Sequence, residues 1–123
     1  MKNIIVTNNS LVVKEQKLPC IYVEEDADQV LAKVRDLVHM GYLLLSHPLG
    51  ASIKMIHSPV VSILMEEKTG PMDLESVEVI EGAILKLRAA LGERTFDYRN
   101  RSDYEIVDRD RLLAAFQELK LNI

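Results

Sequence analysis

Apolar positions along the chain fall into short continuous runs that alternate with longer stretches of helical spacing. The runs at residues 4–6, 20–23, 42–45 and 60–65 are bounded by turn residues, which predicts four strands. The runs at 42–45 and 60–65 contain almost no polar position. Such runs are typical of central strands that are covered by helices on both faces.

Two segments between these runs carry the i, i+4, i+7 spacing of amphipathic helices. Asp26 is expected to cap the first helix, with Gln29 in the capping-box position, and Gly41 to end it. Asp73 and Gly92 bound the second helix in the same way. The apolar stripes are Val30, Val34, Leu37 and Val38 in the first helix and Val77, Ile80, Ile84, Leu87 and Leu91 in the second.

The pattern is weaker near the start and the end of the chain. We interpret residues 11–17 as an extended excursion, residues 93–103 as an exposed loop and residues 104–107 as a short edge strand. Asp108 is then expected to cap a last helix. The inward face of that helix would be Leu112, Phe116 and Leu119.

Strands that alternate with helices predict one α/β domain over residues 1–123. We expect a three-layer sandwich, with a mostly parallel sheet of four or five strands and about three main helices. The interval at residues 46–59 shows no helical pattern. Either one antiparallel strand pair or a short helix would account for that interval.

Composition narrows the class of protein. A chain of 123 residues that is 48% hydrophobic has room for one core and is too apolar to be disordered. No apolar run reaches the roughly 18 residues of a membrane span, and a net charge of −4 argues against nucleic acid as a partner. The first residues lack the apolar stretch of a signal peptide, so we expect a cytoplasmic location.

The sequence offers little recognisable cofactor or metal chemistry. Glycine-rich phosphate motifs and the GxSxG elbow are absent, so no cofactor is expected. Cys20 is the single cysteine, which excludes an intramolecular disulfide and a cysteine-based metal site, and we interpret it as a small buried hydrophobe. His47 and His57 stand ten residues apart without a metal-ligand spacing, and no metal is expected.

Polar residues gather after the first strand and after the strand at 42–45. In open α/β sheets, ligands bind outside the carboxyl ends of the strands. Hydroxyls, amides, one lysine and an imidazole suit a small anion. The same residue types are also ordinary turn formers, and His47 could simply hold its loop by bonding the backbone. The candidate ligand-binding residues are Thr7, Asn8, Asn9, Ser46, His47, Ser52 and Lys54.

Three motifs, in this order, resemble the GrdX family: Thr7-Asn8-Asn9, the helical segment at 34–39, and the segment at 44–49 followed by Ser52-Ile53-Lys54. The resemblance covers about residues 3–90. It implies a small cytoplasmic protein of anaerobic bacteria, encoded beside glycine, sarcosine or betaine reductase genes. The matching positions are Thr7, Asn8, Asn9, Arg35, Asp36, His39, Ser46, His47, Pro48, Ser52 and Lys54.

Three functions follow from these observations. The first is a non-enzymatic accessory module, linked to amino-acid reductase metabolism, that binds a small anionic metabolite or a partner protein. The second is a small-molecule enzyme with His47 as acid or base and Lys54 as electrostatic stabiliser. The third is a structural interaction protein, a homodimer formed through a helix face or the edge at 104–107. We favour the first.

Overall fold

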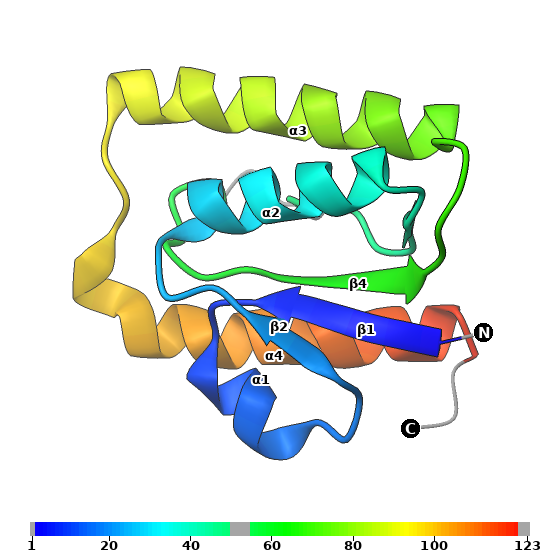
Figure 1. Cartoon of the computed structure of the whole chain (residues 1–123). Helices are drawn as coiled ribbons and strands as arrows, with labels where there is room; N and C mark the ends of the chain where they lie inside the picture. The colour runs from blue at the N-terminus through cyan, green and yellow to red at the C-terminus, as the bar shows by residue number, and fades with distance from the viewer. Residues whose placement is uncertain (1, 50–54, 121–123) are drawn as a thin grey trace.

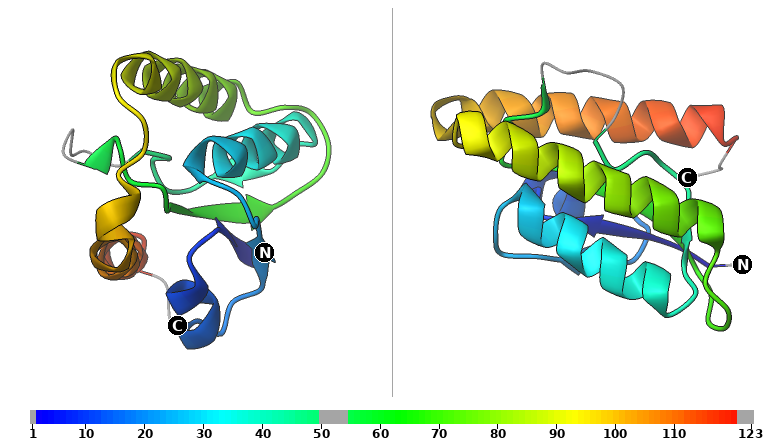
Figure 2. Two further views of the ribbon diagram at one scale, coloured as in Figure 1. Left: turned by 90° about the vertical axis from the view of Figure 1, so that its left-hand side faces the viewer. Right: turned by 90° about the horizontal axis from the view of Figure 1, so that it is seen from above.

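The computed structural model describes residues 2–49 and 55–120. In this part of the chain a four-stranded sheet lies between two pairs of helices, as Figures 1 and 2 show. Helices α2 and α3 cover one face, and α1 and α4 cover the other. The structure is therefore the three-layer α/β sandwich that the sequence predicts. The strands are β1 (Lys2–Thr7), β2 (Cys20–Tyr22), β3 (Leu43–Leu44) and β4 (Ser62–Glu67).

The sheet is mixed rather than mostly parallel. Its order is β2-β1-β4-β3, with β1 parallel to β2 and β4 antiparallel to both of its neighbours. Three strands thus point the same way, while β4 is inserted between β1 and β3 in the reverse direction. Parallel neighbours need a crossover connection. The described residues of this interval, 45–49 and 55–61, contain no helix long enough for one, and β4 returns antiparallel to β3.

The described residues contain α1 (Ser10–Glu15), α2 (Ala27–His39), α3 (Leu74–Glu93) and α4 (Arg101–Glu118). Both long amphipathic helices are confirmed. The extended excursion predicted at residues 11–17 is wrong, because α1 lies there and forms the crossover between the parallel strands β1 and β2.

The edge strand predicted at residues 104–107 is also wrong. A 3-10 turn, η2 (Tyr98–Asn100), leads directly into α4, which includes these residues. The β-branched Ile106 and Val107 suggested a strand, but both are exposed side chains on the helix. Packing of Leu112 and Phe116 against the sheet outweighs this weak local preference. A homodimer that pairs strands at 104–107 is therefore ruled out.

Core side chains alternate along the central strands. Ile4 and Val6 of β1 point towards α2 and α3, whereas Ile5 points towards α1 and α4. Strand β4 follows the same alternation, with Leu64 on the α1 and α4 side. Successive strand residues face opposite sides of a sheet, so a strand covered on both faces is apolar at every position.

The two predicted N-caps, Asp73 and Asp26, use their carboxylates differently. Asp73 caps α3, because its carboxylate accepts a hydrogen bond from the Ser76 backbone N–H. Asp26 stands at the start of α2 without a side-chain cap bond, and its carboxylate instead accepts the hydroxyl of Tyr98. Gly41 ends α2 with a φ of +108°, a conformation that favours glycine.

Candidate functional site

The turn after β1 is a buried hydrogen-bond network. Thr7 and Asn9 are fully buried. The Thr7 hydroxyl accepts a hydrogen bond from the Asn9 backbone N–H at 2.9 Å and pairs with the Ser62 hydroxyl at 2.7 Å. The Asn9 side chain caps α1 by accepting from the Leu11 N–H at 3.1 Å. These polar atoms have internal partners, and a ligand-binding role for Thr7 and Asn9 stays a prediction.

Asn8 joins three segments of the chain through one side chain. Its Nδ2 donates to the carbonyl oxygens of Glu25 at 2.8 Å and Pro59 at 2.7 Å. Its Oδ1 accepts from the Val61 N–H at 2.9 Å. Both amide protons are used and the side chain is 1% exposed. The polar atoms of the Asn8 side chain are therefore bonded to the protein itself at the carboxyl end of β1. A ligand-binding role for Asn8 also stays a prediction.

Asp108 completes this network, although the sequence suggested only a helix cap. It lies within α4 and is 2% exposed. Its carboxylate accepts from Asn9 Nδ2 at 2.9 Å, from the Ser62 hydroxyl at 2.6 Å and from the Ser62 N–H at 2.9 Å. Burial raises the pKa of Asp108, against the lowering effect of these hydrogen bonds and of Arg111. Asp108 therefore anchors α4 to β4 and to the turn after β1.

The position of Asp108 could have been recognised in the sequence. It stands four and eight residues before Leu112 and Phe116, on the stripe of α4 that faces the sheet. An acid on an apolar stripe is buried only when it has hydrogen-bond partners. The spacing therefore indicates a polar anchor, but the partner residues, 46 and 99 positions away, cannot be found from it.

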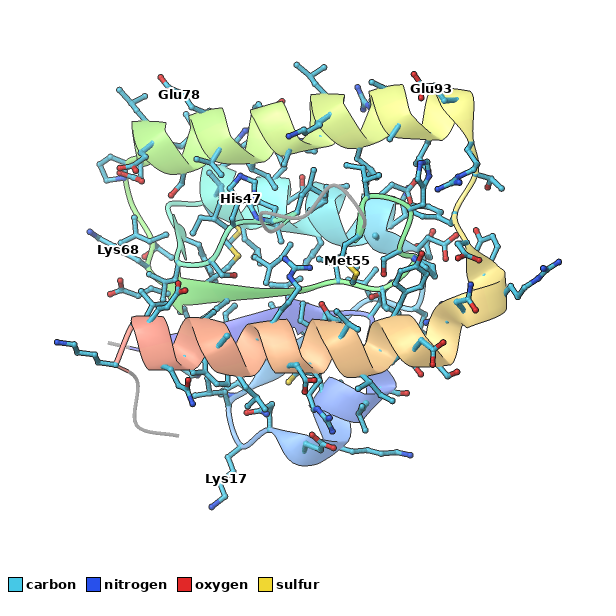
Figure 3. The ribbon with its side chains drawn as sticks, turned by 180° about the vertical axis from the view of Figure 1, so that it is seen from behind. Lys17, His47, Met55, Lys68, Glu78 and Glu93 are labelled. Carbon is cyan, nitrogen blue, oxygen red and sulfur yellow. The ribbon has the colours of Figure 1, made fainter. Side chains whose placement is uncertain are left out.

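Ser46 and His47 follow β3, the edge strand that lies next to β4 in the sheet. The Ser46 hydroxyl oxygen accepts from the Leu64 N–H at 2.9 Å. His47 Nδ1 accepts from the Leu49 N–H at 3.2 Å, which places the proton of the neutral ring on Nε2. Figure 3 shows His47 on the face of the molecule between α3 and α4. Of the candidate residues that the structure describes, His47 alone is an exposed side chain.

A hollow of about 350 Å³ opens between His47 and α4, and we call it the α4 hollow. Ser46, His47 and Ser62 line it on the sheet side, and Arg111 and Glu118 line it on the helix side. Because Ser62 also bonds Asp108, the inner end of the α4 hollow adjoins the buried network. Arg111 was missed in the sequence, where the arginines between residues 94 and 111 alternate with acids and suggest a solvated surface.

A second hollow of about 350 Å³ lies on the other side of His47, between β3 and the start of α3. It shares Ser46 and His47 with the α4 hollow but is lined by the acids Asp73 and Glu75. An anion beside His47 would therefore face Asp73 and Glu75 in this second hollow, and Arg111 together with Glu118 in the α4 hollow.

Two cations, one from α3 and one from α4, act on His47. Partial burial, then Lys86 of α3 and Arg111 of α4, lower the pKa of His47. Neither Lys86 nor Arg111 forms an ion pair within residues 2–49 and 55–120. Cations that lower the pKa of a histidine also favour an anion at the same place.

The other predicted site residues add less. Ser52 and Lys54 lie outside the described residues. Cys20 is half-buried, and burial raises the pKa of its thiol, the opposite of what a reactive thiolate requires. Across the described ranges, no three histidine, cysteine, aspartate or glutamate side chains are grouped so that they could hold a metal ion.

Comparison with known proteins agrees with the motifs in the sequence. The family model described as GrdX-like protein matches residues 4–117, nearly the whole chain. No curated protein and no solved structure matches the chain. None of the helices in the described part of the chain has the length and apolar character needed to cross a bilayer. The match over residues 4–117 shows that the chain belongs to the GrdX-like protein family.

Proposed function

We propose that this GrdX-like chain is a non-enzymatic module that binds a small anionic metabolite in the α4 hollow. One observation carries the proposal: His47 lies in the field of Lys86 and Arg111, two cations that form no ion pair within the described residues. Bringing like charges together costs free energy. A bound anion would offset that cost.

The donors beside the α4 hollow suit a carboxylate or a phosphate. The Arg111 guanidinium can bind either group through two parallel N–H donors. His47 Nε2 supplies another N–H, and the Ser46 hydroxyl, whose oxygen accepts from Leu64, can donate its own proton. The hollow of about 350 Å³ lies at the lower end of the roughly 300–1,000 Å³ that ligand sites occupy, which favours a small metabolite.

No observation favours the enzymatic alternative. General acid or base catalysis needs a histidine within hydrogen-bond reach of a reacting or orienting group. In the described residues, the hydrogen bond of the His47 ring is to the Leu49 backbone. The link to amino-acid reductase metabolism follows from the GrdX resemblance alone and is part of the proposal. A protein partner at the same surface is the alternative.

Thermal unfolding in the presence of acetate, citrate, inorganic phosphate and AMP tests the proposal. An anion at 100 times its dissociation constant adds about 2.7 kcal/mol to the free energy of unfolding. Arg111→Gln and Lys86→Gln should each reduce the stabilisation by the active anion. Arg99→Gln removes an exposed charge from η2. Arg99 neither lines the α4 hollow nor acts on the pKa of His47, so this variant should leave the stabilisation unchanged.

Titration of the His47 ring by proton NMR provides a direct readout. A bound anion neutralises the two cations and should raise the pKa of His47, and Arg111→Gln should raise it without ligand. If none of the four anions stabilises the chain and none moves the His47 titration, the proposal is wrong. Stabilisation that is equal in wild type and Arg111→Gln would place the anion elsewhere and also overturn it.

A further inference from the structure

The two edges of the sheet differ in how their backbone groups are bonded. Strand β3 forms one edge, and its Leu44 N–H donates to the Ser76 hydroxyl oxygen of α3 at 3.1 Å. Strand β2 forms the other edge and lies in front of β1 in Figure 1. Helix α3 therefore closes the edge at β3, and the edge at β2 is the place where a further strand can join the sheet.

Alternate residues of β2 direct their backbone groups away from β1. The Pro19 carbonyl and the Val23 N–H are both bonded to β1 at 2.9 Å. Because the backbone groups of successive strand residues point to opposite sides, Cys20 and Tyr22 present theirs at the open edge. Within residues 2–49 and 55–120, these outward groups have no backbone partner. Pro19 lacks an N–H but faces β1, so the open edge is not interrupted there.

We propose that two copies of the chain pair through β2 in antiparallel orientation, about a two-fold axis at Ile21. In this register Cys20 lies opposite the partner's Tyr22, and Tyr22 lies opposite the partner's Cys20. All of these positions face outward, so each pair exchanges both of its backbone hydrogen bonds. Ile21 lies between the two pairs, and its backbone groups face β1. The open edge of β2 is therefore complementary to itself, as a two-fold interface requires.

The side chains of β2 suit this pairing. Residues directly opposite each other in a sheet point to the same face. Tyr22 is 46% exposed on the face that carries α1 and α4, and it would cover Cys20 of the partner subunit. Ile21 packs against the core under α2 and α3 and would meet the partner's Ile21. A cross-strand pair of β-branched side chains stabilises a sheet.

Charges at the two ends of β2 favour a second copy of the chain as the occupant. Lys17 precedes the strand, and Glu24 and Glu25 follow it. In the part of the chain that the structure describes, none of the three forms an ion pair, and Figure 3 shows Lys17 pointing away from the rest of the molecule. Antiparallel pairing brings Lys17 of each chain to the acidic end of the other. The attraction therefore occurs at both ends of the pair.

Sedimentation velocity of the intact chain between about 5 μM and about 0.5 mM tests the proposal. A strand of three residues gives a small interface, so the dimer should be weak and the average mass should rise with concentration. Tyr22→Pro removes an outward N–H without touching the bonds to β1, and should weaken association roughly tenfold or more. Tyr22→Phe keeps that N–H and the ring, and should dimerise as the wild type does.

An exchange of charges tests the pairing independently of Tyr22. Lys17→Glu and Glu25→Lys should each weaken the dimer, because like charges then meet at both ends. The two substitutions together should restore it.

Disulfide trapping tests the register. In a Cys20→Ser background, Ile21→Cys places two thiols opposite each other at a Cα separation of about 4.5 Å, which a disulfide can bridge. Mild oxidation should therefore give a covalent dimer. Tyr22→Cys in the same background lies diagonally from its copy and should not be trapped.

Three results would overturn the proposal. A chain that stays monomeric at about 0.5 mM would leave the edge of β2 to a strand of another protein. A dimer that Tyr22→Pro leaves unchanged would place the contact elsewhere, and so would equal trapping of Tyr22→Cys and Ile21→Cys. Circular dichroism checks that Tyr22→Pro keeps its fold, and the charge exchange and the trapping do not depend on that variant.

Discussion

Replacing Asp108 by alanine removes the acceptor that holds α4 against the sheet. Three hydrogen bonds disappear, but two of the donors keep another partner. Asn9 Nδ2 keeps one acceptor, the Glu105 carbonyl at 2.9 Å, but its second amide proton loses Asp108, whereas the Ser62 hydroxyl still pairs with Thr7. The Ser62 N–H, which donates to Asp108 at 2.9 Å, is left without its acceptor inside the protein.

The second Asn9 amide proton and the Ser62 N–H are then two buried donors without a partner, and each costs about 1–3 kcal/mol. Removing a buried carboxylate also relieves the desolvation that raises the pKa of Asp108, which offsets part of the cost. We therefore expect Asp108→Ala to lower the free energy of unfolding by about 1–3 kcal/mol in urea titrations followed by circular dichroism. A change below about 0.5 kcal/mol, the range of neutral surface substitutions, would refute the reasoning.

The pH dependence of the stability of Asp108→Asn, compared with wild type, tests the contribution of the Asp108 charge separately. In the folded chain the pKa of Asp108 is raised above its usual 3.8, so the folded state binds more protons here than the unfolded state between the two values. The stability from this group is then complete below 3.8 and is lost as pH rises through the folded pKa. The advantage of wild type over Asp108→Asn should therefore be largest near about pH 4 and shrink as pH rises. An advantage that grows with pH would contradict this.

Two further predictions concern backbone geometry and capping, and urea unfolding measures both. Gly41→Ala should cost more than about 1 kcal/mol, because Gly41 has a φ of +108° and an added Cβ would lie 2.7 Å from the Gly70 nitrogen. The matched Gly82→Ala lies within α3, where a Cβ meets nothing within 4 Å, and should stabilise the chain by about 0.5–1 kcal/mol. If both substitutions had the same sign, the geometric argument would fail. Asp73→Ala removes the cap bond to Ser76 and should cost about 0.5–2 kcal/mol, and a neutral result would show that the cap is dispensable.

The sequence by itself determined the elements with a strong local signal. The apolar stripes of α2 and α3 and the apolar runs of β1 and β4 show directly which side chains are buried. A helix that buries one face is apolar with a period of 3.6 residues, and a strand covered on both faces is apolar at every position. The GrdX resemblance, confirmed over residues 4–117, was likewise readable from short motifs in order.

Only the tertiary structure decided how these elements meet. Local pattern cannot show that β4 enters the sheet antiparallel between β1 and β3, because the same apolar run suits either direction. It also cannot show that residues 104–107 continue a helix, since packing of the rest of α4 outweighs their strand preference.

In the candidate site, too, some residues could be predicted from the sequence and others are known only from the tertiary structure. Serine and histidine after β3 were predicted from their place at a strand end, but their charged neighbours come from distant helices. Lys86 and Arg111 both act on the pKa of His47 only because α3 and α4 pack on opposite faces of the sheet, on either side of His47 (Figure 3). Asp108 reaches Asn9 across 99 positions of sequence for the same reason. Such contacts depend on the folded path of the whole chain, which no local spacing encodes.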